Sequence, residues 1–190
     1  MHRHAAALVT VSAGMLIVII LLEFFYFRRL SGGLASLDMR VFGFTPDEGM
    51  AWLTALGRRG SEIVIVWHYL TFALVFPALF SLTLIALFLS AGQRLPRFAA
   101  LSNSVRVGFA LALVLPFTLA DYVQNFAVVR LLSDFLSANP DSLGLASALI
   151  VTKFALGLIP LAVIVAFYLA GERHKRAGLP GNEDEQGRSQ

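Results

Sequence analysis

The chain contains no cysteine, which excludes disulfide bonds, thiol redox chemistry and thiolate ligands for zinc or an iron–sulfur cluster. Charge is scarce as well: 14% of the 190 residues are charged, compared with about one-quarter in an average soluble domain. Hydrophobic residues make up 57%. Such a chain lacks the polar surface that a water-soluble globule needs, and it is too apolar to be a disordered tail protein.

The net charge of +3 and the isoelectric point of about 9.7 would suit a nucleic-acid-binding protein. The mean hydropathy of +0.75 indicates a membrane protein instead. In membrane proteins an excess of Lys and Arg marks the cytoplasmic loops. We therefore expect a lipid bilayer as the main partner and no nucleic acid.

Long apolar runs replace the missing polar surface. A membrane-spanning helix requires about 20 mostly apolar residues, and four runs reach that length, at about 6–27, 63–91, 105–129 and 146–170. The sequence thus predicts an all-α integral membrane protein, a four-transmembrane-helix bundle that occupies residues 1–170. We expect the first run to be retained rather than cleaved as a signal peptide, because it is long and ends in bulky aromatic residues.

The first loop contains the signals of a short helix. Thr45 suits the N-cap, Pro46 the first helical position and Glu48 the far side of a capping box. Gly57 provides a stop. The pattern predicts an amphipathic helix at about 46–57 in the first outer loop, unless this segment is only a helical connector. Residues 171–190 are polar and are predicted to form a disordered cytoplasmic tail.

The orientation follows from the distribution of arginine. An even number of spans places both termini on one side, and the short loop between spans two and three contains Arg94, Arg97 and Arg106 with no acid. Positive loops remain in the cytoplasm. We predict a bacterial inner-membrane protein whose N- and C-termini are cytoplasmic.

Polar side chains inside the spans are the candidate site, since charged groups in a bilayer are costly and frequently functional. With the rise of about 1.5 Å per residue, the ionisable members all fall in one layer below the outer boundary. We expect an ion pair between Lys153 and Asp121, a second pair between Glu23 and His68, and a semi-polar pocket open to the outer face. The candidates are Glu23, His68, Asp121, Gln124, Asn125 and Lys153.

Three roles are compatible with this layer: structural bonding between helices, a ligand or catalytic pocket, and passage of protons or ions. A divalent metal would compete with Lys153, which is the resident cation. Haem usually requires facing His or Met ligands, and His68 is the only histidine in the spans. We therefore predict neither metal nor cofactor.

Several motifs resemble a group of bacterial four-transmembrane-helix membrane proteins. They are the run Gly43-Phe44-Thr45-Pro46-Asp47-Glu48, then Leu56-Gly57, Gly60 and Phe76-Pro77, followed by Asp121 and Asn125. The group has an acid before the Phe-Pro pair and an Asp-x-x-Glu-Asn run, where this chain has Thr71 and Gln124. These departures argue against a catalytic pocket, and the resemblance implies no activity.

The leading functional hypothesis is an accessory or structural subunit of a membrane complex or a homo-oligomer, or a protein that binds an apolar or lipid molecule from the outer leaflet. The alternative is a membrane enzyme acting on a lipid or isoprenoid. In that case Asp121 and His68 would be the acid–base groups and Lys153 the electrostatic partner.

Overall fold

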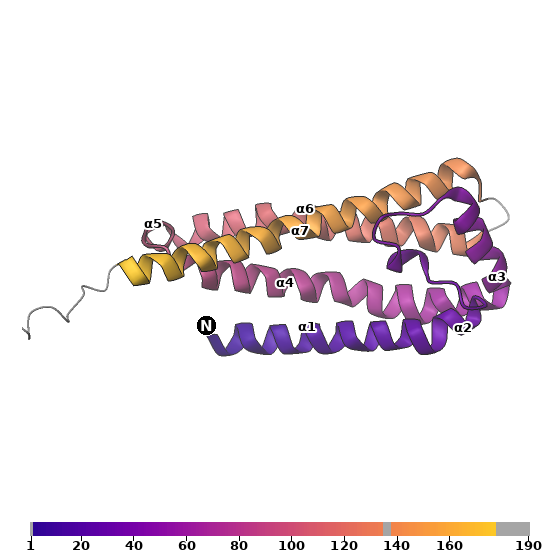
Figure 1. Cartoon of the computed structure of the whole chain (residues 1–190), viewed down its shortest axis with the longest axis horizontal. Helices are drawn as coiled ribbons and strands as arrows, with labels where there is room; N and C mark the ends of the chain where they lie inside the picture. The colour runs from indigo at the N-terminus through magenta and orange to yellow at the C-terminus, as the bar shows by residue number, and fades with distance from the viewer. Residues whose placement is uncertain (1, 135–137, 178–190) are drawn as a thin grey trace, which may run out of the picture.

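The protein is a bundle of long helices. The computed structural model describes residues 2–134 and 138–177, and every regular element within them is helical. Four helical runs are long and apolar enough to cross a membrane, namely Ala5–Leu30, Pro46–Gly92, Asn103–Ser133 and Pro140–Lys175. They lie side by side, and the N-terminus and the end of the last helix are at the same end of the bundle (Figure 1).

The described elements follow one another along the chain as α1 (His2–Leu22), the π-helix η1 (Glu23–Phe27), α2 (Arg28–Leu30), the 3₁₀-helix η2 (Leu37–Met39), α3 (Pro46–Val64), the π-helix η3 (Ile65–Phe72), α4 (Ala73–Gly92), α5 (Pro96–Ala99), α6 (Asn103–Ser133) and α7 (Pro140–Ala177). We call the two ends of the bundle the α3 end and the α5 end (Figure 1).

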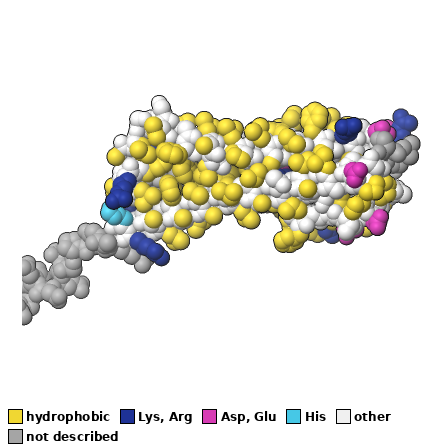
Figure 2. All heavy atoms as spheres, turned by 90° about the horizontal axis from the view of Figure 1, so that it is seen from above, with side chains coloured by type: hydrophobic (Ala, Val, Ile, Leu, Met, Phe, Trp, Pro, Cys, Tyr) yellow, Lys and Arg dark blue, Asp and Glu magenta, His cyan; other side chains and the backbone are white. Residues whose placement is uncertain are grey.

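The surface shows why this bundle suits a bilayer. Hydrophobic side chains cover the middle of the visible face, while charged side chains gather near its two ends (Figure 2). Helices that are apolar on their outward faces are the structures that lipid accommodates, because all their backbone groups are bonded internally. The four-helix architecture expected from the sequence is therefore present.

The loop helix and the second span form one helical run. Thr45 caps α3, and its hydroxyl and the Glu48 side chain make the reciprocal bonds of a capping box. Gly57 has φ 58° and ψ −174°, so the helical path breaks there as its sequence suggests. The helix then resumes and continues to Val64, whereas a full stop was expected.

The last helix extends beyond the predicted span. α7 continues to Ala177, so the segment that starts at Gly171 begins as helix rather than as a disordered tail. The remainder of the predicted tail, residues 178–190, lies outside the described residues.

The connection between α2 and α3 folds back onto the bundle. Leu37 is completely buried and belongs to the same hydrophobic core as Trp52 of α3 and Leu143 of α7. The backbone N–H of Phe44 donates to the Ser147 hydroxyl of α7 at 2.8 Å. The connection is therefore part of the core at the α3 end, and it brings Asp38 to the polar side chains of the spans.

Candidate functional site

A carboxylate from the α2–α3 connection occupies the centre of the polar layer. Asp38 lies in η2 and is buried. Its Oδ2 accepts hydrogen bonds from the Tyr69 hydroxyl at 2.9 Å and is 2.9 Å from Nε2 of His68. Its Oδ1 accepts from Nε2 of Gln124 at 2.7 Å. Side chains of η3 and α6 thus bond to one loop residue.

Lys153 is the cation of the same cluster. Its Nζ donates to Oδ1 of Asp121 at 3.0 Å and to Oε1 of Gln124. It also lies 3.6 Å from Oδ1 of Asp38. We call the six connected residues the Asp38 network: Asp38, His68, Tyr69, Asp121, Gln124 and Lys153. The expected ion pair between Lys153 and Asp121 is present, and a second carboxylate shares the ammonium group.

The electrostatics favour an ionised Asp38. Burial on its own would raise the pKa of this carboxyl group, but the Lys153 ammonium and the hydrogen bonds from His68 and Tyr69 outweigh burial and hold the pKa well below its usual range. A buried carboxylate of this kind is stable only with its partners in place. Asp38 therefore fastens the connection to the bundle.

A π-helix helps His68 and Tyr69 to reach the same oxygen. These are consecutive residues, and on an α-helix consecutive side chains point in clearly different directions. They lie in η3, where the wider π turn reduces that difference, and their rings pack edge to face with centroids 4.8 Å apart. Such π segments occur frequently at functional sites. Their presence here explains how two neighbours bond to Asp38.

Glu23 does not pair with His68, contrary to expectation. Its Oε1 accepts the backbone N–H of Ser36 at 2.8 Å and lies 3.7 Å from Nε of Arg28. Ser36 is the residue that precedes η2. Glu23 therefore fixes the start of the short helix that presents Asp38, while His68 bonds to Asp38 itself.

Asn125 has a backbone role. Pro77 has no N–H to donate to the carbonyl of Ala73 one turn earlier. Nδ2 of Asn125 donates to that carbonyl at 3.0 Å, and the Tyr122 hydroxyl donates to the next one, of Leu74, at 2.9 Å. These bonds satisfy the backbone where proline interrupts α4, as happens in membrane helices.

The polar layer is a closed cluster rather than an open pocket. All six candidates from the sequence are buried, and the roof over them includes the connection that carries Asp38. Within the described part of the chain, no three His, Asp or Glu side chains are placed to hold a metal ion; Lys153 lies between the two carboxylates instead.

Three polar atoms of this layer remain unused. Nδ1 of His68, Oδ1 of Asn125 and Oε2 of Glu23 are buried and find no hydrogen-bond partner among the described residues. A histidine whose other nitrogen is held by a carboxylate has the geometry of a general base. The imidazole of His68 is therefore a group with potential chemistry, and it is buried.

Asp38 is the functional candidate that sequence reasoning missed. It lies between the first two apolar runs of the sequence, outside the segments in which a charge is costly enough to stand out. The available signal was its surroundings: Leu37 and Met39 flank it, and the residues from Leu30 to Met39 contain no other charge.

Comparison of the chain with protein-family models, curated proteins and solved structures finds no match.

Proposed function

We propose that the protein is an integral membrane protein of the bacterial inner membrane that acts as an accessory subunit of a membrane complex. Its α3 end would lie in the outer leaflet, and the connection held by Asp38 would present a rigid apolar surface to a transmembrane helix of the partner. The observation that supports this most directly is Phe42, which is 96% exposed on a connection that buried charges hold in place.

Preorganisation of the connection favours the binding of a partner. Burying carboxylates and an ammonium group costs free energy, and one function of such buried charges is to specify a single conformation. Val41 and Phe42 of the clamped connection are exposed, and Val151 of α7, which lies beside Gly43 of the connection, is exposed as well. A surface that is already ordered loses little conformational entropy on binding. Non-helical backbone at membrane depth is compatible with a bilayer where protein covers it.

The orientation is part of the proposal. The α5 end contains Arg94, Arg97 and Arg106 in and beside the short connection between α4 and α6, and we place it in the cytoplasm together with both termini. A membrane-impermeant thiol reagent added to intact cells should label Ala51→Cys and leave Ser102→Cys unlabelled. The reverse pattern would contradict this orientation.

The partner role predicts an effect of Phe42. Burying a phenylalanine side chain stabilises an interface by about 1.5–3 kcal/mol, so Phe42→Ser should weaken the complex by about ten-fold or more. The measurement is the amount of a stoichiometric protein that co-purifies from native membranes. Phe126→Ser is the matched control, because Phe126 is also highly exposed, at 82%, but belongs to α6 and not to the connection.

Photo-crosslinking makes this test specific. A photoreactive phenylalanine analogue at position 42 should crosslink to a transmembrane segment of one other protein, and the same analogue at position 126 should not. Equal recovery of the partner with both serine variants would refute the docking surface. A crosslink to a second copy of the chain would replace the accessory role with a homo-oligomer.

A second candidate function rests on the free Nδ1 of His68, which supports the membrane-enzyme alternative with a lipid or isoprenoid substrate. In this reading Asp38 orients the imidazole, and the connection has to open for substrate to enter. Lipid mass spectrometry on the same membranes separates the two proposals. A lipid species that accumulates with His68→Gln, in the absence of a stoichiometric partner, would support the enzyme.

A further inference from the structure

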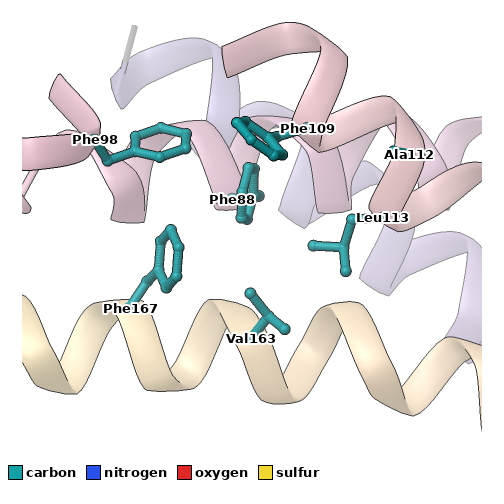
Figure 3. A pocket seen from close by; sticks show the side chains of 7 residues that line it. All are labelled: Phe88, Phe98, Phe109, Ala112, Leu113, Val163 and Phe167. Carbon is teal, nitrogen blue, oxygen red and sulfur yellow. The ribbon is translucent and has the colours of Figure 1, made fainter. Parts of the chain in front are cut away.

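The α5 end of the bundle has a groove that the Asp38 network does not reach. Phe88 of α4, Phe98 of α5 and Phe167 of α7 form its floor, with ring centroids 5.2–5.6 Å apart. Phe109 and Val163 line it as well, and the volume is about 440 Å³. Figure 3 shows these side chains gathered between the α5–α6 segment and α7.

The floor is fixed by close packing. Gly92 lies directly against the Phe98 ring, so that a Cβ atom at this position would be 2.3 Å from the ring. Ala112 of α6 also lines the groove and is small and exposed, so the groove is open along the apolar surface of the bundle. An open apolar groove of this kind admits a hydrocarbon chain.

Basic residues border the same groove towards the end of the bundle. A neighbouring hollow of about 750 Å³ shares Phe98 and Phe167 with it and is lined by Arg97 and His174. A third hollow shares His174 and adds Arg173. The groove, at about 440 Å³, and the neighbouring hollow, at about 750 Å³, both fall within the range of about 300–1,000 Å³ that is typical of small-molecule sites. The apolar groove thus adjoins a basic rim through shared lining residues.

The rim has positive charge available for a ligand. Arg94 is bonded to Glu172 at 2.6 Å, and Lys175 lies 3.8 Å from the same carboxylate. Arg97 and Arg173 are exposed, and neither has an acidic partner among the described residues. Among the described residues Glu172 is therefore already neutralised by Arg94 and Lys175, and Arg97 and Arg173 are exposed.

We infer that this groove binds one anionic diacyl phospholipid, with an acyl chain on the phenylalanine floor and the phosphate at Arg97 and Arg173. Basic pockets between membrane helices on the cytoplasmic side recognise anionic head groups, and planar guanidinium groups bind phosphate in a bidentate manner. The inference rests on the membrane insertion proposed above and is independent of any protein partner.

The test is native mass spectrometry of the detergent-purified full chain, mixed with equal amounts of dioleoyl phosphatidylglycerol and dioleoyl phosphatidylcholine. The acyl chains are identical, so the ratio of the two bound lipids reports the head group alone. We expect one phosphatidylglycerol to be retained preferentially. Each arginine should contribute a roughly five-fold preference for phosphatidylglycerol. The double variant Arg97→Gln with Arg173→Gln should therefore lower the ratio of bound phosphatidylglycerol to bound phosphatidylcholine about 25-fold.

The matched control is the pair Arg29→Gln with Arg59→Gln, two exposed arginines at the α3 end. This double variant should keep the preference for phosphatidylglycerol.

A second comparison tests the apolar groove. Ala112→Trp should lower the retained amount of both lipids about ten-fold or more, while Leu115→Trp should leave it unchanged. Leu115 is 46% exposed on α6, and it is not among the groove's lining residues. Both tryptophans enter exposed positions, so both variants should fold.

Two results would overturn the inference: equal retention of the two lipids by the wild-type chain, or an equal effect of the two arginine pairs. A dimer that forms through the groove in place of a bound lipid would also overturn it. A chain that remains soluble without detergent would instead refute membrane insertion itself, so the two failures are distinguishable.

Discussion

Asp38→Ala is expected to lower the free energy of unfolding by about 3–5 kcal/mol, the usual effect of breaking a buried ion pair from one side. The substitution removes the acceptor for His68, Tyr69 and Gln124 and one of two carboxylates near Lys153. Buried donors without an acceptor carry the full desolvation penalty. The measurement is a denaturant titration of the detergent-solubilised protein.

The matched control is Asp47→Ala. Asp47 is an exposed acid in the first turn of α3, where its favourable interaction with the helix dipole contributes about 0.3–1 kcal/mol. Hydrogen exchange provides a local readout: in Asp38→Ala the amides of Ser36 and Phe44 should lose protection, because both bond to the bundle from the connection. If the two variants lose similar stability, the connection is not held by Asp38.

Lys153→Ala should have an effect of similar size, about 3–5 kcal/mol, because it leaves Asp121 and Asp38 as buried carboxylates without a cation. Asp121→Ala should cost less than Lys153→Ala, since Lys153 keeps its contacts with Asp38 and Gln124. The double variant should be less destabilised than the sum of the two single variants, with a coupling energy of about 0.5–3 kcal/mol.

The control for this cycle is the exposed pair Arg58 and Glu62 on α3, with Nε of Arg58 3.2 Å from Oε1 of Glu62. A solvated pair of this type contributes only about 0.3–0.5 kcal/mol. Additive effects of Lys153→Ala and Asp121→Ala, or a coupling energy no greater than that of the exposed pair, would show that the buried ion pair does not stabilise the bundle.

Burial and pairing were predictable from the sequence to different degrees. Charged residues in otherwise apolar helices need partners, which is sufficient to predict the pair between Lys153 and Asp121. The same rule does not decide which of several acids bonds to His68. Glu23 and Asp38 both reach the polar layer, and His68 bonds to Asp38 of the α2–α3 connection. Tyr69, the next residue in η3, bonds to the same oxygen.

The sequence by itself determined the number of long apolar helices, the cap of α3 at Thr45 and the residue types that need partners inside the bundle. These properties depend on local composition and spacing, which hydropathy and capping chemistry report directly. Only the tertiary structure decided that residues 31–45 fold back onto the bundle and place Asp38 against Lys153. That contact joins positions 115 residues apart. Asp38 reaches Lys153 from η2, which follows the Ser36 amide bonded to Glu23, and such a long-range bond has no local sequence signature.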